Sequence, residues 1–233
     1  MSIGKTLKHI NRSLRVPFNR KSAFNKLAEF HSSPLSMDKL VDWAMKFPAS
    51  GHMKVRSSQV RFEIMSLAKA VADLKPERIL EIGTAEGGTL FIWANLASKQ
   101  VISCDILEPG VKQSLYEAFP PPNSQCKVKN LTGDSHTKAF LERVEAELAG
   151  EKVDFLFIDG DHTEVGVEAD YNEYHHLVRS GGIIAFHDIV EKQAIPENQV
   201  YHFWKRLKEN TNTEEIVNDA NQTGYGIGIV RVP

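Results

Sequence analysis

The chain has 233 residues, a formal net charge of −2 and 42% hydrophobic residues. This length suits one α/β domain with a modest extension and a substantial core. No apolar run approaches the roughly eighteen residues that a membrane helix needs, and the first residues lack the apolar core of a signal peptide. We therefore expect a soluble, cytoplasmic protein in which the two cysteines, Cys104 and Cys126, are reduced and buried.

Charge is distributed unevenly along the chain. Residues 1–26 hold seven basic residues and no acid, which leaves 21 basic residues against 30 acidic ones, a balance of −9, for the rest. Ile3, Leu7, Ile10 and Leu14 recur at helical spacing and predict a basic amphipathic helix. Such a helix suits peripheral contact with an anionic membrane, a polyanionic partner, a second subunit of a homo-oligomer, or docking on its own domain. Because few aromatic residues accompany the basic ones, we expect no nucleic-acid partner.

The N-terminal part of the chain predicts a helical cap over residues 1–59. Its expected helices are broken by Pro17, Pro34 and Pro48, and they cover 3–15, 22–31 and 36–46. A glycine-containing loop near Gly51 precedes the next helix and is placed to act as a lid over a substrate. A second domain, residues 60–233, begins with that helix.

Strands and helices alternate from residue 60 onward. The expected strands are 79–82, 101–106, 126–131, 153–158, 182–186, 214–218 and 226–232, and the expected helices are 60–74, 89–96, 111–119, 136–149, 164–178 and 199–209. Five strands alternating with helices predict a doubly wound parallel sheet with right-handed crossovers. The last two strands are joined by a segment too short for a crossover helix, so they should pair antiparallel.

The segment that follows the first strand is the most informative part of the sequence. It has the pattern Glu-x-Gly-x-x-x-Gly, from Glu81 through Gly83 to Gly87. A dinucleotide fingerprint needs Gly-x-Gly-x-x-Gly, but Ala85 occupies the position of the second glycine, which disfavours pyrophosphate. A carboxylate such as Glu81 instead suits the cationic amino-acid tail of a ligand.

This pattern resembles the first motif of class I S-adenosylmethionine-dependent methyltransferases. The resemblance implies an α/β, Rossmann-like sheet of seven strands, mostly parallel with an antiparallel last strand, and it makes residues 60–233 an S-adenosylmethionine-binding domain. Glu81 would then face the amino-acid end of the cofactor.

Several strands end in an acidic residue on the same edge of the expected sheet, where open α/β sheets bind their ligands. Asp105 lies 22 residues after Gly83, at the position where an acid can accept both ribose hydroxyls. Asp134 and Ser135 lie where methyltransferases of this class contact adenine. We assign the cofactor site to Glu81, Gly83, Thr84, Gly87, Asp105, Asp134, Ser135 and Asp159.

Two further motifs, Ile-Asp-Gly-Asp-His over 158–162 and Gly-Gly-x-x-x-x-His-Asp over 181–188, resemble small-molecule O-methyltransferases of the macrolide-sugar, aminocoumarin-sugar and cephalosporin-hydroxylase-like kind. In metal-dependent members a Mg²⁺ is held at the ends of strands four and five. The resemblance places these ligands at Asp159, His187 and Asp188. This chain departs from the usual oxygen ligands at His187, which favours a softer cation such as Mn²⁺ or Fe²⁺, or leaves His187 outside the ligand set.

A route without metal needs a general base to accept the proton of the hydroxyl that is methylated. The candidates are Asp161, His162 and His187, and the resemblance to sugar methyltransferases favours Asp161. Asp161 and Thr163 are also suited to cap the helix that follows.

These features predict an S-adenosylmethionine-dependent O-methyltransferase that acts on a hydroxyl of a small molecule, such as a sugar or secondary metabolite, with or without a divalent metal. One alternative is a metal-dependent hydroxylase, and another is a non-catalytic module of the same fold that binds a partner or a membrane.

Overall fold

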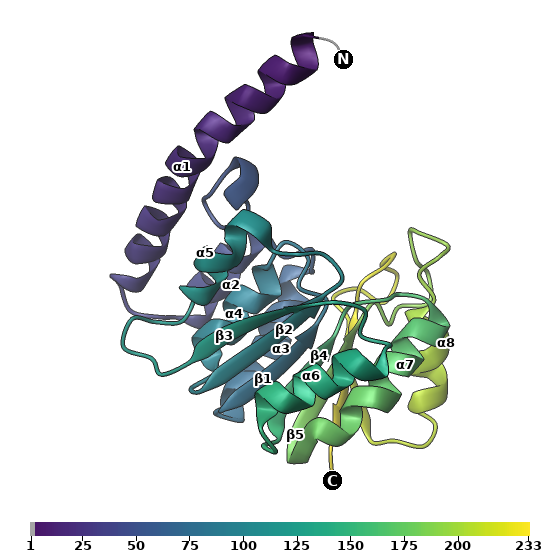
Figure 1. Cartoon of the computed structure of the whole chain (residues 1–233). Coiled ribbons are helices and arrows are strands. Elements are labelled where there is room, and N and C mark those ends of the chain that lie inside the picture. Colours follow the sequence, from purple (N-terminus) through teal and green to yellow (C-terminus); the bar gives the residue numbers. More distant parts are fainter. Residues whose placement is uncertain (1–2) are drawn as a thin grey trace.

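The computed structural model describes the backbone of residues 3–233 and the side chains of residues 16–233 (Figure 1). Its seven strands form one sheet in the order β3-β2-β1-β4-β5-β7-β6. The strands are β1 (Arg78–Ile82), β2 (Gln100–Asp105), β3 (Lys127–Thr132), β4 (Val153–Ile158), β5 (Val178–His187), β6 (Thr213–Ile216) and β7 (Ile227–Arg231). The α-helices are α1 (Ile3–His31), α2 (Met37–Met45), α3 (Arg61–Asp73), α4 (Gly88–Leu96), α5 (Gln113–Glu117), α6 (Lys138–Leu148), α7 (Glu164–Tyr174) and α8 (Val200–Leu207).

The sheet is parallel from β3 through β5, and β7 runs antiparallel to both β5 and β6. This confirms the predicted mixed sheet with its antiparallel last strand. The chain leaves β1 toward β2 on one side and reaches β4 on the other, so the strand order reverses beside β1. Crevices at such reversals, outside the carboxyl ends of the strands, bind ligands in open α/β folds.

Helices cover both faces of the sheet, and every residue of β4 is buried as a result (Figure 1). Alternate residues of β1 enter different cores: Ile79 packs with residues of α1 to α5, whereas Leu80 packs with residues of α6, α7 and α8. This alternation fixes which strand side chains face which layer, because a one-residue slip would exchange the two sets.

The N-terminal helix differs from the prediction of two helices separated by Pro17. In the structure α1 continues through Pro17. Proline removes one hydrogen bond of the helical ladder, but the following turns are held by the buried side chains of Ala23, Leu27 and Phe30. The side chains of residues 1–15, which include the predicted amphipathic face and four of its basic residues, lie outside the described part.

Residues of the expected cap share a core with α4. Phe30 and Phe47 each contact Phe91 edge to face, with ring centroids 4.8 and 5.6 Å apart. Such aromatic pairs add stabilisation beyond the area that they bury. The cap is thus packed against the sheet domain, and the boundary at residue 60 stays a prediction.

None of the helices described is long and apolar enough to cross a membrane. Cys104 and Cys126 are buried free thiols, as expected.

Candidate active site

A cavity of about 1000 Å³ opens at the carboxyl ends of β1, β2, β4 and β5. Its walls come from seven parts of the chain: the segment Arg56–Gln59 before α3, the turn after β1, the end of β2, the residues after β3, the loop from Asp159 to Thr163, the segment 187–198 and the segment 223–225. The strand ends therefore converge as the sequence predicts.

The turn after β1 is shaped by close backbone contacts. Gly83 has a φ of +102°, and a Cβ at this position would lie 2.0 Å from the carbonyl oxygen of Asp159. A Cβ on Gly88 would lie 2.0 Å from the backbone nitrogen of Ser57. Only glycine permits both approaches. They bring the cap segment, β1 and β4 together around one wall of the cavity.

Glu81 lies outside this wall, contrary to its predicted contact with a cofactor. Its side chain is fully buried on the α4 side of the sheet and does not line the cavity. The indole Nε1–H of Trp93 and the hydroxyl of Ser103 donate to its two oxygens at 2.9 and 2.5 Å. Because strand side chains alternate, the neighbouring Ile82 faces the cavity instead.

Burial raises the pKa of Glu81 to about 7, and hydrogen bonds from Ser103, Thr89 and Trp93 only partly oppose this shift. Glu81 is therefore a core residue beneath the turn.

Asp105 ends β2 and lines the cavity, as predicted. Its Oδ2 accepts the backbone N–H of Ala85 at 2.7 Å, and its Oδ1 accepts that of Leu107 at 2.8 Å. Each carboxylate oxygen can accept a second hydrogen bond. Asp105 is thus held in place by the turn after β1, with capacity left for a ligand.

Asp134 and Ser135 also line the cavity. Asp134 is exposed and accepts the backbone N–H of His136 at 3.0 Å, whereas the hydroxyl of Ser135 donates to the buried Asp170 at 2.7 Å. The hydroxyl of Ser135 therefore already has a protein partner. The hydrogen bond with Asp170 also raises the pKa of His136 to about 9, against the effect of burial.

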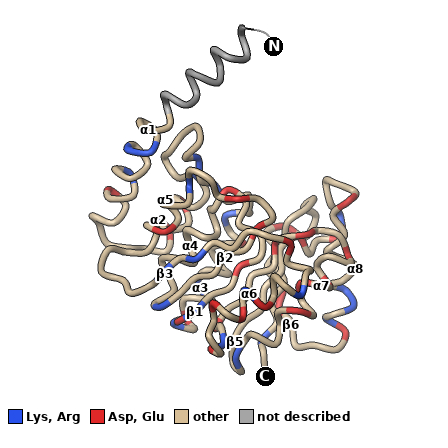
Figure 2. The backbone as a smooth tube through the Cα atoms, in the orientation of Figure 1, with Lys and Arg blue, Asp and Glu red and all other residues tan. Residues whose placement is uncertain are grey.

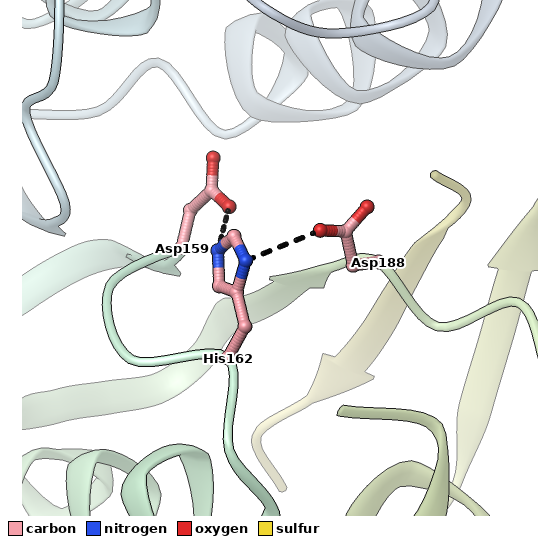
Figure 3. Close-up of side chains that lie close together, drawn as sticks. All are labelled: Asp159, His162 and Asp188. Carbon is pink, nitrogen blue, oxygen red and sulfur yellow. Dashed lines mark hydrogen bonds and ion pairs between the residues drawn. The ribbon is translucent and has the colours of Figure 1, made fainter. Parts of the chain in front are cut away.

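His162 lines the cavity and lies between two carboxylates, Asp159 and Asp188 (Figure 3). Its Nε2 is 3.1 Å from Oδ1 of Asp159, and its Nδ1 is 3.5 Å from Oδ2 of Asp188. One ligand atom from each of the three residues lies within 4.8 Å of the others, so the group has the composition and size of a divalent-cation site. The predicted set of Asp159, His187 and Asp188 also lies close together, since Nδ1 of His187 is 3.0 Å from Oδ1 of Asp159 and 3.4 Å from Oδ1 of Asp188. Among the described residues, however, the group with one ligand atom from each residue inside 4.8 Å contains His162 and not His187.

His187 is buried behind Asp159. Its Nδ1 lies 3.0 Å from Oδ1 of Asp159, and its Nε2 has no hydrogen-bond partner among the described residues. Although burial opposes it, the charge of Asp159 raises the pKa of His187. His187 therefore supports the same carboxylate as His162, from the other side.

The charges in this group stabilise one another. Burial alone would raise the pKa of Asp159, but the charge of His187 and the hydrogen bond with His162 outweigh burial and hold the pKa below its usual range. The hydrogen bond with Asp159 raises the pKa of His162 to about 9.

Asp161 has a capping position in the structure. It is exposed, and its Oδ1 accepts the backbone N–H of Thr163 at 2.8 Å, while Thr163 caps α7 through Gly166. Asp161 lines the cavity, but it makes none of the contacts within the group of Asp159, His162 and Asp188. The geometry favours a turn-forming role for it.

Two further residues, which no local sequence pattern indicates, donate hydrogen bonds to the carboxylates of Asp159 and Asp188. Nε2 of Gln59 donates to Oδ2 of Asp159 at 2.9 Å, and Nδ2 of Asn198 donates to Oδ2 of Asp188 at 2.6 Å. Gln59 lies 100 residues before its partner, so only the folded topology shows the contact.

Known proteins share this fold. A family model described as a methyltransferase domain matches residues 80–189. The uncharacterized protein R132 of Acanthamoeba polyphaga mimivirus is 29% identical over 145 residues, which cover 61% of this chain and 65% of R132, just under two thirds of its length.

Among solved structures, the O-methyltransferase from Bacillus cereus in complex with SAH has a TM-score of 0.59 and 20% identity, over 85% of this chain and 92% of that one. MycE, a methyltransferase from the mycinamycin biosynthetic pathway in complex with Mg and SAH, has a TM-score of 0.52 and 20% identity, over 71% of this chain and 48% of that one. The family model covers the turn after β1, Asp105 and the group around His162. Residues 80–189 thus match the methyltransferase-domain model, and the chain shares its fold with these two methyltransferase structures.

Proposed function

We propose that this protein transfers the methyl group of S-adenosylmethionine to a hydroxyl of a small molecule, such as a sugar or secondary metabolite, in the cytoplasm. The observation that carries the proposal is that one cavity is lined both by the glycine-rich turn with Asp105 and by the group of Asp159, His162 and Asp188.

The charge of the cavity suits a cationic cofactor. Among the described residues, its lining has one arginine, Arg56, and the histidines His136, His162 and His187, against seven acids, which are Glu86, Asp105, Asp134, Asp159, Asp161, Asp188 and Glu197. When bound, S-adenosylmethionine supplies a methyl group that its sulfonium already activates. Asp105 would accept hydrogen bonds from the ribose, and Gly83 and Thr84, which line the same cavity, would face the amino-acid end. The chain's own task is then to place the acceptor and remove its proton.

A divalent cation fits the group of Asp159, His162 and Asp188, where it would displace the proton that the two carboxylates favour on His162. Its mixture of one nitrogen and two carboxylate ligands favours Mn²⁺ or Fe²⁺ over Mg²⁺, which prefers oxygen. A cation there would lower the pKa of an acceptor hydroxyl. Gln59 and Asn198 would keep the two carboxylates in position.

His187 is the better placed proton acceptor once His162 is assigned to the cation, because a cation on Asp159 would offset the carboxylate charge that raises the pKa of His187. It lines the cavity, Asp159 orients it through Nδ1, and its Nε2 is left without a partner among the described side chains. Asp161 is less suited, because it already caps the turn before α7.

The hydroxylase alternative is less favoured. Non-haem iron oxygenases use two histidines and one carboxylate, whereas this group has one histidine and two carboxylates. A hydroxylase would also leave the contacts of Asp105 with the glycine-rich turn without a purpose.

Calorimetry with S-adenosylmethionine and SAH tests the cofactor assignment. We expect micromolar binding, and a folded protein that binds neither ligand would contradict the proposal. The transferase assignment is tested by incubation with S-adenosylmethionine that carries a labelled methyl group and a panel of hydroxyl compounds, with and without a chelator. Label should enter an oxygen-linked methyl group, and chelation should slow its transfer.

We further propose that the basic N-terminal segment contacts a second copy of the chain or an anionic membrane. In its described part, Phe18 is 77% exposed, and Arg20 and Lys21 are exposed as well. Figure 2 shows basic residues in blue along the described part of α1. Deletion of residues 1–20 should change the sedimentation-derived mass or abolish binding to vesicles that contain anionic lipid. A variant unchanged in both measurements would contradict this assignment.

A further inference from the structure

A buried carboxylate outside the cavity, Glu63, contacts a segment that forms part of the cavity wall. Glu63 lies in the first turn of α3 and has no exposed surface. Its Oε1 accepts the backbone N–H of Asn218 at 3.0 Å and the side-chain amide of Gln222 at 2.8 Å, and its Oε2 accepts the backbone N–H of Gly226 at 2.9 Å. No lysine or arginine in the described part of the chain pairs with it. All three donors belong to the segment 217–226 that joins β6 to β7.

That segment has a backbone that needs support. Gly224, Tyr225 and Gly226 have consecutive φ angles of +76°, +65° and +81°. A tyrosine in the left-handed region is unfavourable and persists only where surrounding contacts fix it. The hydrogen bond from Gly226 to Glu63 fixes the residue next to Tyr225.

The same segment reaches the proposed cation site. The backbone N–H of Tyr225 donates to Oδ1 of Asp188 at 3.0 Å, and the Tyr225 ring lies 5.9 Å from the ring of His187. Two neighbouring amide groups, those of Tyr225 and Gly226, thus bind two different carboxylates, Asp188 and Glu63. Asp188 is itself in the left-handed region, with a φ of +65°, and depends on these contacts for its orientation.

We propose that Glu63 is a positioning residue for the active site: by holding segment 217–226 in its strained form, it orients Asp188 toward the cation and Tyr225 against His187. This inference rests on the proposed function, because it assumes a cation at Asp159, His162 and Asp188. It adds a residue that precedes the matched methyltransferase domain and makes no contact with the group itself.

The matched variants Glu63→Gln and Asp154→Asn test it. Asp154 is also a buried carboxylate with three donors, which are the backbone N–H groups of Glu77 and Arg78 and the side chain of Arg179. It lies at the start of β4, at the end of the parallel strands that is opposite to the cavity. Each substitution keeps the shape of the side chain and removes its charge and part of its acceptor capacity. Both variants should melt at a lower temperature than the wild type.

Mn²⁺ titration followed by electron paramagnetic resonance is the first readout. We expect Glu63→Gln to raise the Mn²⁺ dissociation constant about tenfold, in the range of other residues that orient metal ligands, and Asp154→Asn to leave it unchanged. SAH affinity should stay within about twofold in both variants, because the turn after β1 is untouched. Equal Mn²⁺ affinity in Glu63→Gln and Asp154→Asn would reduce Glu63 to a structural role and overturn the proposal.

Hydrogen–deuterium exchange gives a readout that needs no cation. Exchange of the peptide with Tyr225 and Gly226, and of the peptide with Asp188, should accelerate in Glu63→Gln and not in Asp154→Asn. Unchanged protection of these peptides would overturn the proposal by itself. If Glu63→Gln does not fold, Glu63→Asp keeps the charge but shortens the side chain by one methylene group, which loosens its three hydrogen bonds to the segment and should shift both readouts in the same direction by two- to threefold.

The results also separate this inference from the proposed function. A wild type that binds SAH but not Mn²⁺ contradicts the cation assignment, and exchange then decides whether Glu63 holds the segment. A wild type that binds Mn²⁺, with a Glu63→Gln variant unchanged in both readouts, contradicts only the positioning role.

Discussion

The indole of Trp93 donates a 2.9 Å hydrogen bond to Glu81, in the core between β1 and α4 rather than in the cavity. Glu81, the acid of the Glu-x-Gly-x-x-x-Gly motif, is thereby kept apart from the cofactor that this motif predicts for it. Trp93 in turn packs edge to face on Phe155 and Phe157 of β4. The conformation of the turn after β1 is thus supported from below by a buried polar contact within an aromatic cluster.

Glu81 should make the stability of the protein depend on pH. Its pKa is about 7 in the folded state and near 4.5 in the unfolded state, so the folded state keeps its proton longer. The stability linked to this proton is fully present below about pH 4.5 and is lost as the pH rises through 7, a loss of roughly 3 kcal/mol by pH 8. The difference in unfolding free energy between the wild type and Glu81→Gln, measured in urea at pH 5 and pH 8, should change by this amount in favour of the variant. A constant difference would contradict the assignment.

Asp105→Asn should weaken the binding of S-adenosylmethionine by roughly 30- to 150-fold, because two hydrogen bonds to a charged acceptor are lost or reversed. Calorimetry measures this change. Glu108→Gln is the matched control, since Glu108 is an exposed acid three residues further along the chain and does not line the cavity. Normal binding by Asp105→Asn would exclude Asp105 from the ribose contact.

His162→Gln and His187→Gln should separate the two histidines. Loss of a ligand in the first variant should raise the Mn²⁺ dissociation constant by at least about tenfold. The second variant should bind Mn²⁺ and S-adenosylmethionine nearly as the wild type does, but methylate slowly. Changes in turnover, measured once an acceptor is known, are expected to be about 100-fold or more. The reverse pattern of Mn²⁺ binding would restore the ligand set expected from sequence.

Gly88→Ala should destabilise the protein by about 2 kcal/mol or more, even though alanine favours a helix. The added Cβ would lie within 2.5 Å of backbone atoms of Arg56 and Ser57, which cannot move as freely as a side chain can. Gly110→Ala is the control, because nothing lies within 4 Å of a Cβ there and only its φ of +53° is unfavourable. Urea unfolding gives both values, and similar losses in the two variants would argue against the close contact.

Local patterns predicted the sheet well because its strands are short, buried, mostly apolar runs that are bounded by turn residues at both ends. Strand β4, for example, begins and ends where the apolar run does. Strand β5 begins at Val178, four residues before the predicted start at Gly182. The prediction started late because Arg179, Ser180 and Gly181 have the composition of a loop. In the fold Arg179 pairs with Asp154 at 2.6 Å, and a Cβ on Gly182 would lie 2.8 Å from the carbonyl oxygen of Asp154. Both are tertiary contacts that composition does not encode.

The candidate site was predictable to the level of strand ends and no further. Asp105, Asp159 and Asp188 follow strands, and the topology alone brings them to one edge. Which histidine enters the group around Asp159 depends on side-chain direction in a loop, and the sequence favoured His187 where the structure has His162. The contributions of Gln59 and Glu63 depend on contacts across 100 residues or more, which no local pattern can reveal.

The hydrogen bond from Gln59 to Asp159 bears on how this protein can be dissected. A shortened protein that starts at residue 60 would remove one of the three side chains that hold Asp159, and it would uncover Phe91, which Phe30 and Phe47 now shield. The smallest unit worth transplanting into a chimera therefore starts upstream of the methyltransferase motifs, and a swap designed on those motifs alone would yield an insoluble or inactive hybrid.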